Sequence, residues 1–481
     1  MKPVTPKERF KMNRSAALEG CTAALGRPQG LRYQKAAVIL KRALVASVLA
    51  PLLSTAARAQ PPAATGAIQL TLDEAIRRGL ETSQRIAEAV ARGEAAEAVV
   101  GERHAATLPQ IAAQAGYTRT NHVEAFGILS PGNQFRVIYP DVPDNYRTRL
   151  DLQWPIYTGG RLDALERAAR IEATASADEI AAARGDLTLE ITRAYWALVT
   201  ATEALRVVQE SAARVGAHLR DLRNQLAAGL VPPNDVFTVE AQESRQRMLT
   251  VQAGATRDVA EAELARLAGA APGTPVTAAA ALDAPPVTTA SLEALVDLAR
   301  QQRPERAAMA KRVSAAGERR RAAAAGVKPT VGVGGGVDYA NPNPRIFPRE
   351  DAWRTSWDAS VNLTWPLFDG GRARSEMAEA AALGRATAAR LADFDASLAV
   401  EIRQRLREIE ASRAAIDAAS DAVRSAAEAR RVLGERFAAG VATATDVLDA
   451  QVALLQAEQD RTQALANAHL ADARMARALG R

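Results

Sequence analysis

The string "DLQWPIYTGGR" at residues 151–161 returns as "NLTWPLFDGGR" at residues 362–372, an offset of 211 positions. At the same offset Asp235-Val236 falls on Asp446-Val447, and the segments 146–269 and 357–480 align without a gap. Upstream, "LTLDEAI" resembles "ASLEALV" at an offset of 220. Self-similarity at a fixed spacing predicts two tandem copies of one structural unit.

The repeat predicts how the whole chain is organised. Each copy is expected to contain a helix, a β-hairpin and a long helical hairpin in that order, and an Ala- and Pro-rich linker is expected between the copies. A signal peptide with an overlong start is expected at 1–59 and an N-terminal tail at 60–69. The first repeat is expected at 70–269, with its β-hairpin at 110–158 and its helical hairpin at 160–268. A linker (270–289) then leads to the second repeat (290–481), with its β-hairpin at 329–368 and its helical hairpin at 370–479.

The N-terminal segment has the order of a secretory signal. Basic residues precede the apolar run "ALVASVLAPLL", and the small residues around Ala57 and Ala59 predict cleavage after Ala59. The leader would carry 11 of the 61 Lys and Arg residues and 2 of the 55 Asp and Glu residues, so the exported chain has a net charge of −3. This charge gives no support to nucleic-acid binding. The single cysteine, Cys21, would leave with the leader, so no disulfide is expected.

The segments 146–154 and 357–365 alternate between apolar and strongly polar residues. A period of two predicts a strand with one apolar and one polar face. Each apolar face has an aromatic residue at both ends, which is typical of the lipid-facing side of a transmembrane strand. A half-exposed strand of a soluble sandwich is the alternative. Weaker alternation at 110–119 and 330–339 predicts the partner strands, with the stretches 120–145 and 340–352 as surface loops.

The repeated string itself is expected to be the joint between a membrane strand and a helix. Trp at the end of the apolar layer suits the membrane–water interface, Pro has no N–H to donate and is expected to end the strand pairing, and a Gly pair permits a sharp turn. The joint residues are Trp154, Pro155, Gly159 and Gly160 in the first copy and Trp365, Pro366, Gly370 and Gly371 in the second.

Two further features indicate an oligomer with long paired helices. Four strands cannot close around a lumen, and lipid forbids open sheet edges, so several chains must share one barrel. The segments 161–228 and 372–439 contain no proline and repeat an apolar residue every seven positions, for example at Ile191, Leu198 and Leu205. A sustained seven-residue period predicts coiled-coil packing. Return helices are expected over 235–268 and 446–479.

These features together resemble the TolC family of outer-membrane efflux channels over essentially the whole exported chain. The resemblance rests on the tandem halves, the two joints and the "AG-x5-DV" turns that begin at Gly229 and Gly440. It implies an α+β membrane protein in which three chains build a shared twelve-stranded barrel in the outer membrane, continued by coiled-coil helical hairpins across the periplasm. It also implies docking on a periplasmic adaptor protein and an inner-membrane pump of the RND, ABC or MFS type.

The resemblance assigns roles to residues near the helical turns. Gly229, Asp235 and Gly440 match the adaptor-contacting tips, although Gly at a helix end is equally explained by a left-handed backbone. Asp446 and Asp449 match acids that ring the periplasmic entrance in the family, and capping of the return helix is the alternative role for Asp446. Asp235 is expected to serve equally well as a cap of the first return helix. Phe437 stands where the family often has a tyrosine, and Ala442 where it often has an arginine. The closed entrance is therefore expected to depend on packing at Phe437, or to be less firmly shut.

An enzyme is not expected. The four histidines are scattered without metal-ligand spacing, no Gly-x-Ser-x-Gly motif is present, and no cofactor or metal is expected. The function expected is an exit duct that passes small molecules from a periplasmic adaptor and pump to the exterior. A type I protein-secretion channel of the same family is the alternative, and a coiled-coil structural protein of the cell surface is a candidate of a different class.

Overall fold

The computed structural model of the chain describes residues 68–286 and 290–481. The predicted signal peptide lies outside these ranges, together with nearly all of the predicted tail and the last three residues of the predicted linker. Helices predominate in the described residues, and the strands are few and mostly gathered in one sheet.

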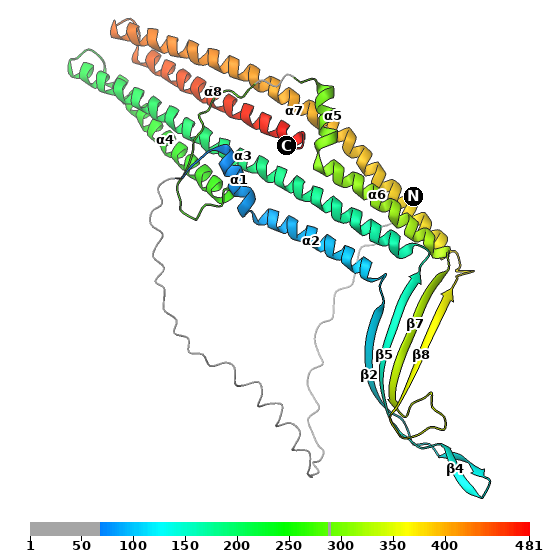
Figure 1. Ribbon diagram of the computed structural model, residues 1–481. Coiled ribbons are helices and arrows are strands. Elements are labelled where there is room, and N and C mark those ends of the chain that lie inside the picture. Colours follow the sequence, from blue (N-terminus) through cyan, green and yellow to red (C-terminus); the bar gives the residue numbers. More distant parts are fainter. Residues whose placement is uncertain (1–67, 287–289) are drawn as a thin grey trace, which may run out of the picture. The chain divides into compact units, whose positions relative to one another are not determined.

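Four long helices form two antiparallel hairpins (Figure 1). The first hairpin is α3 (Arg161–Ala227) followed by α4 (Pro233–Leu267). The second is α7 (Arg372–Ala438) followed by α8 (Ala444–Ala478). The first helix of each hairpin has 67 residues and the second has 35, so the two halves match in length and differ from the expected bounds by only a few residues.

A pair of shorter helices precedes the sheet strands in each half, where a single helix was expected. The pairs are α1 (Leu72–Thr82) with α2 (Gln84–Ala105), and α5 (Leu292–Gln302) with α6 (Pro304–Ala324). Pro304 stands at the first turn of α6, where its missing N–H is tolerated but where it cannot continue α5. A 3₁₀ turn, η1 (Ala325–Val327), follows α6.

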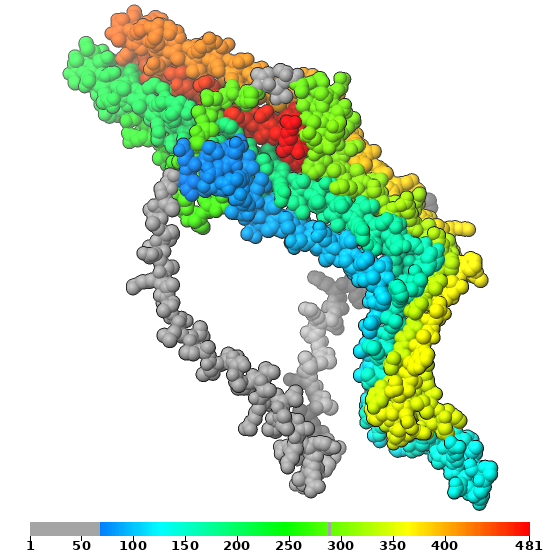
Figure 2. Space-filling view, viewed as in Figure 1, coloured from blue at the N-terminus to red at the C-terminus, as the bar shows by residue number. Residues whose placement is uncertain are grey.

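The helices pack side by side around α3. It contacts α2, α4, α6 and α8, and α6 in turn contacts α7, so α6 bridges the two long helices (Figure 1). The heptad positions Ile191 and Leu198 of α3 and Ile402 of α7 are buried, while Leu205 is half-buried. The turns of the two hairpins, green and orange in the space-filling view, lie together (Figure 2).

A four-stranded antiparallel sheet follows the helices, in the order β2-β5-β7-β8. Its strands are β2 (Gln110–Arg119), β5 (Asp144–Tyr157), β7 (Thr330–Asn341) and β8 (Arg354–Thr364). The expected hairpins are β2 with β5 and β7 with β8, and the pairing of β5 with β7 joins the two halves into one sheet. Strands β2 and β8 are the edges of this sheet.

Pro155 does not end the strand, contrary to the expectation from the repeated string. Strand β5 continues to Tyr157, and Pro155 lies opposite Gly332 of β7, with an irregular register after it. The pairing of β2 with β5 extends only to Gln153, so one edge of β5 lacks a partner within the described residues and a residue without an N–H is tolerated. Pro366 does follow the end of β8.

Two short sheets occur where the sequence was interpreted as loop, tail or linker. The expected loop at 120–145 contains a hairpin of β3 (Phe126–Ser130) and β4 (Gln134–Tyr139). The "SPGNQ" turn between two apolar runs was the overlooked signal. Strand β1 (Ile68–Leu70) spans the expected boundary of tail and first repeat, and it pairs in parallel with β6 (Val276–Ala278) of the expected linker.

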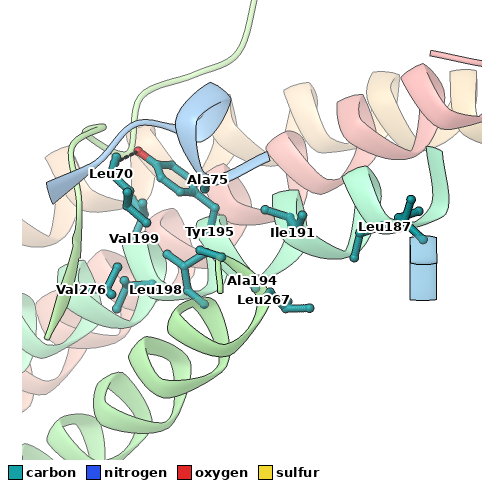
Figure 3. Close-up of a cluster of buried hydrophobic side chains, with 13 residues drawn as sticks. Leu70, Ala75, Leu187, Ile191, Ala194, Tyr195, Leu198, Val199, Leu267 and Val276 are labelled. Atoms are coloured by element: carbon teal, nitrogen blue, oxygen red, sulfur yellow. Dashed lines mark hydrogen bonds between the residues drawn. The ribbon is translucent and has the colours of Figure 1, made fainter. Parts of the chain in front are cut away.

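This parallel pair belongs to a buried core, shown in Figure 3. Leu70 and Val276 pack with Ile191 and Tyr195 of α3 and with residues at the end of α4. The Tyr195 hydroxyl donates to the carbonyl oxygen of Leu70 at 3.3 Å and accepts from the backbone N–H of Ala280 at 3.0 Å. The segment after α4 is therefore part of the packed structure of the first half.

Among the helices of residues 68–286 and 290–481, none has both the length and the apolar character that crossing a membrane requires.

Candidate functional site

The four-stranded sheet has one apolar face, and it is exposed. Residues paired across neighbouring strands share a face. Leu150 of β5 lies opposite Ala113 of β2 and Val337 of β7, and Val337 lies opposite Trp357 of β8. Leu150 is 51% exposed, Trp357 73% and Val361 72%. The apolar face expected for two strands therefore extends over all four, and nothing in the described chain covers these side chains.

An aromatic cluster stands at the end of this face that is distant from the helices. The ring centroids of Tyr117 and Tyr146 are 5.1 Å apart, and those of Tyr339 and Trp353 are 4.8 Å apart. Tyr146 also approaches Trp353 at 5.9 Å, which links the two pairs across the sheet. Trp154 stands near the opposite end, so aromatic side chains bound the apolar face on both sides.

The opposite face of the sheet is polar and carries a network of charges. Arg149 of β5 donates from Nε to Asp151 at 2.6 Å and from Nη1 to Asp338 of β7 at 2.5 Å. It also donates to Asp358 of β8 at 2.9 and 3.3 Å. Arg147 donates to Asp338 at 2.6 Å. Three carboxylates thus converge on one guanidinium. In the described ranges, no group of three or more His, Cys, Asp or Glu side chains is arranged to hold a metal ion.

Glycine at position 336 makes this network possible. Arg149 must cross β7 to reach Asp358 on β8, and Gly336 lies opposite Asp151 of β5 and Asp358 of β8 on the strand between. A Cβ at Gly336 would lie 2.6 Å from Nη2 of Arg149 and 2.9 Å from a backbone oxygen. Any larger residue would displace the guanidinium. The glycine-rich run of β7 therefore provides the space over which the arginine passes.

The tryptophans of the repeated string fix the strand ends to the preceding helices. The indole N–H of Trp154 donates to the carbonyl oxygen of Thr107 at 3.3 Å, and that of Trp365 donates to Val327 at 3.2 Å. Thr107 and Val327 are separated by the offset of 220 that relates the upstream parts of the two halves. The same hydrogen bond is therefore made in both copies, in addition to any role of these rings at an interface.

The glycine pairs of the joint adopt a left-handed backbone. The φ angles are +66° and +85° at Gly159 and Gly160, and +68° and +88° at Gly370 and Gly371. Such angles disfavour residues that carry a Cβ. Only Gly159 also lacks space, because a Cβ there would lie 2.8 Å from the Cβ of Lys328. The sharp turn expected from the Gly-Gly sequence is what the structure contains.

Asp369 caps the helix that leaves the second joint. Its carboxylate accepts from the backbone N–H groups of Gly371 at 2.9 Å and Ala373 at 2.8 Å. These hydrogen bonds to the ionised form lower the pKa of Asp369. In the first copy Thr158 takes this place and accepts, at 3.4 Å, from the N–H of Leu162.

At the opposite end of the long helices, one apolar cluster joins the turns of both hairpins. It contains Leu219 and Leu222 of α3, Val236 and Val239 of α4, and Leu448 of α8, and Phe437 of α7 packs against it. We call this region, from 215 to 239 and from 437 to 449, the tip. The residues expected at the adaptor contact and at the entrance are thus gathered in one part of the molecule.

Phe437 contacts a buried histidine. Its ring meets the imidazole of His218 on α3 edge to face, with centroids 5.3 Å apart. His218 is 8% exposed, and Nε2 has no hydrogen-bond partner in the described residues. Burial lowers the pKa of His218, and the charge of Asp221 opposes that shift in part. The packing role expected of Phe437 therefore has a definite partner, which the sequence did not indicate.

Asp446 belongs to the cap of α8. The N-cap is Thr443, whose hydroxyl accepts from the N–H of Asp446 at 3.2 Å, while the Asp446 carboxylate accepts from the N–H of Thr443 at 2.8 Å. This reciprocal pair is a capping box. Hydrogen bonds from the Thr443 backbone and hydroxyl lower the pKa of Asp446. Asp446 therefore has the capping role that was the alternative for it, but it acts as the third helical residue, and Thr443 is the N-cap.

The other two acids predicted near the helical turns, Asp235 and Asp449, differ from Asp446. Asp235 has the corresponding position in α4. Within the described residues no side chain caps that helix, and the Asp235 carboxylate accepts only from its neighbour Asn234, at 3.0 Å. The expectation that Asp235 serves equally well as a cap is wrong, because Pro232 at the N-cap has no N–H to offer it. Asp449 is exposed and lies one turn beyond Asp446. Capping therefore does not explain either Asp235 or Asp449.

Gly229 and Gly440 end α3 and α7 in the same conformation. Their φ angles are +73° and +74°, and the N–H of the following residue bonds back to the carbonyl five residues earlier in both cases. A Cβ at either position would meet nothing within 4 Å. Backbone conformation alone accounts for glycine here, and both positions are open to a partner molecule.

The chain is similar to known proteins over most of its length. A family model described as "Outer membrane efflux protein" matches residues 75–270 and 295–481. The chain belongs to this family. It is 29% identical over 402 residues to protein CyaE of Bordetella pertussis, which covers 83% of this chain and 81% of that protein. It is 27% identical over 396 residues to outer membrane protein TolC of Vibrio cholerae, which covers 79% of this chain and 84% of that protein.

The fold is that of solved members of the outer membrane efflux family. The crystal structure of the outer membrane protein VceC from Vibrio cholerae aligns with a TM-score of 0.70 and 22% identity, over 85% of this chain and 96% of that one. The resemblance inferred from the two joints and the tip turns is therefore confirmed, as is membership in a family of outer-membrane transport channels.

Sequence reasoning missed two structural features of the candidate site. The charges of β5 were assigned to a polar face, but the convergence of Asp151, Asp338 and Asp358 on Arg149 was not foreseen, because it depends on the pairing of β5 with β7. The run "GVGGGVD" was a usable signal, since glycines on one face of a strand indicate close approach of another group. His218 gave no signal, as an isolated histidine on an apolar helix face is ordinary.

Proposed function

We propose that three copies of this chain form one outer-membrane exit duct. The observation that carries the proposal is the four-stranded sheet, which exposes an apolar face and ends in two edge strands, β2 and β8. Unpaired edges are not tolerated in lipid, so β8 of one chain would pair with β2 of the next. Three such sheets give twelve strands, and the polar face with Arg149 would line the lumen.

The dimensions of the apolar face fit a membrane. Tyr146 and Trp154 lie at opposite ends of the face on one strand, about 27 Å apart at the rise of an extended strand. Outer-membrane barrels have an apolar band about 25 Å tall between two aromatic girdles. The aromatic cluster around Trp353 would stand at the outer girdle and the joint tryptophans Trp154 and Trp365 at the inner one. The long helices would then extend into the periplasm.

The tip would receive a periplasmic adaptor protein that links the duct to an inner-membrane pump. Gly229 and Gly440 are open to a partner, and Asp235, in the first turn of α4, is half-buried and has no capping role. Asp446 and Asp449 would face the entrance, where three chains bring six carboxylates together and favour cations. We propose small molecules as the cargo. Export of a protein through the same duct is the second candidate, and no observation on this chain favours it.

A substitution at Gly440 tests the tip. The variant is expressed in a strain from which the native gene has been deleted. Gly440→Trp should still form heat-resistant trimers in the outer membrane. The cells should nevertheless accumulate a fluorescent efflux dye to the level seen in the deletion strain. Gly132→Trp is the matched control, because Gly132 also has a positive φ and open space but lies in the turn between β3 and β4. Normal dye export by the Gly440 variant would contradict the proposed docking.

The same strains separate the alternatives. If the duct exports a protein, the deletion should remove that protein from the medium and leave dye accumulation unchanged. If the chain is a coiled-coil surface protein, the assembly should be extracted without detergent and should not migrate as a heat-resistant trimer. Either result would replace the proposed function.

A further inference from the structure

We propose that Arg149 sets the charge selectivity of the sheet's polar face by neutralising Asp151, Asp338 and Asp358. This inference rests on the proposed function, because it requires that the polar face line a lumen. Arg149 would be a specificity-determining residue in the sheet, at the opposite end of the long helices from Asp446 and Asp449.

The charges on this face are balanced around Arg149. Arg147 pairs with Asp338 at 2.6 Å, and Arg345, from the segment that connects β7 to β8, pairs with Asp358 at 3.1 Å. In the described chain, the carboxylate of Asp151 pairs only with Arg149, at 2.6 Å. The network therefore contains three arginines and three aspartates. Without Arg149 it would have a net negative charge.

Geometry makes Arg149 the centre of this balance. It is the one member of the network whose side chain contacts all three carboxylates, across strands β5, β7 and β8. Its guanidinium is largely covered, with 16% of the side chain exposed, and Gly336 leaves room for it to lie across β7. Asp151 and Asp358 are 21% and 25% exposed, so their charges lie at the surface of the face.

A balanced face has a functional consequence. A fixed negative charge on a pore wall concentrates cations and excludes anions. With Arg149 in place, the strands would present little net charge to a passing solute, whether cationic or anionic. Discrimination by charge would then be confined to the entrance carboxylates Asp446 and Asp449. Removal of Arg149 would expose three additional carboxylates in a trimer, one Asp151 from each chain.

Single-channel recording of the purified full-length trimer in planar bilayers tests this directly. The reversal potential under a KCl gradient gives the ratio of cation to anion permeability. Arg149→Gln should raise this ratio about threefold at low ionic strength, where screening is weak. Asp151→Asn should lower it by a similar factor. The double variant Arg149→Gln with Asp151→Asn should return to the wild-type ratio, because it restores the balance of charge.

The double variant separates charge from structure. It lacks the same guanidinium as Arg149→Gln, so a distorted sheet would leave its ratio shifted, and that result would overturn the inference. Unchanged ratios in both single variants would overturn it as well. If Arg149→Gln fails to assemble, Asp151→Asn alone tests the inference, because this variant keeps Arg149 and two of its carboxylate partners. An unshifted ratio of cation to anion permeability in Asp151→Asn would then overturn the inference.

The wild-type recording separates this inference from the proposed function. A wild-type trimer that conducts, combined with unshifted variants, contradicts only the role of Arg149. A wild-type protein that forms no ion-conducting pore contradicts the proposed duct and the role of Arg149 together.

Discussion

The ring of Phe437 on α7 meets the imidazole of His218 on α3 edge to face, with 5.3 Å between the ring centroids. The two residues belong to different halves of the chain, and their contact lies in the apolar cluster that joins both helical turns. The tip is therefore held by packing between the halves and by the cap of α8. A titratable group lies inside that packing, which makes the stability of the tip dependent on pH.

We predict that the tip loses stability as the pH falls below the ordinary His pKa of 6.5. The folded pKa of His218 is lowered by burial, so below 6.5 the unfolded state binds more protons and the free energy of unfolding decreases with falling pH. The loss should be complete below the lowered folded pKa. Thermal midpoints of wild type and His218→Gln, compared from about pH 7.5 to pH 5, measure this effect. Parallel pH curves for the two proteins would contradict it.

Substitutions at the start of α8 should distinguish the capping role of Asp446 from the effect of its charge and that of Asp449 on ion selectivity. Thr443→Ala should lower the stability of the start of α8 by about 1 kcal/mol and leave ion selectivity unchanged, because no charge is removed. Asp449→Ala should do the reverse, lowering cation selectivity with little change in stability. Asp446→Ala should affect both. Hydrogen exchange of the α8 N-terminus and single-channel recording measure the two quantities. The Asp446→Ala, Asp449→Ala double variant should lose cation selectivity and should not be blocked by trivalent cations, which the six converging carboxylates would bind. If selectivity and block both survive, the two acids have structural roles only.

The joint glycines allow a matched test of space against backbone conformation. Gly160→Ala should cost roughly 1–2 kcal/mol, the penalty for a left-handed residue with a Cβ, because nothing lies within 4 Å of the new atom. Gly159→Ala should cost more, since its Cβ would lie 2.8 Å from Lys328. Thermal unfolding of the two purified variants gives the difference. Equal midpoints would show that Lys328 moves aside freely.

The two faces of the sheet should respond oppositely to a new charge. Arg in place of Leu150 or Val361 on the apolar face should cost about 2–4 kcal/mol near the middle of a membrane and reduce the amount of trimer in the outer membrane. Gln153→Arg and Thr364→Arg on the polar face are the matched controls and should be tolerated. Similar assembly defects on both faces would contradict the assignment of the apolar face to lipid.

The long helices and the joints could be predicted from the sequence because their signals are local and occur twice. Pro-free, Ala-rich runs with a seven-residue period allow little but helix, and the bounds of α3 and α7 follow from the Gly pairs and the tip glycines. The apolar face of β5 and β8 followed from alternation. Each of these signals depends on residues that are neighbours in the sequence or lie one helical turn apart.

Features that depend on contacts between distant segments could not be predicted. Pro155 remains within β5 because the pairing of β2 with β5 stops at Gln153, which only the register reveals. Strand β6 was interpreted as linker because its three residues have no period, and its burial depends on β1. Arg149 and Asp358 each belong to the polar face predicted for their own strand, but their contact required the pairing of β5 with β7 and the absence of a side chain at Gly336.

Covalent cross-linking across the sheet edges tests the central claim, that three chains close one barrel. Ala112 on β2 and Ser360 on β8 lie on the polar face at the two edges, and both can be changed to Cys in a Cys21→Ser background, which removes the single native cysteine. A bismaleimide that spans about 10 Å, roughly twice the spacing of paired strands, should convert membrane-embedded protein into a ladder that ends at three chains. A ladder that stops at two chains, continues beyond three or never forms would contradict the shared barrel.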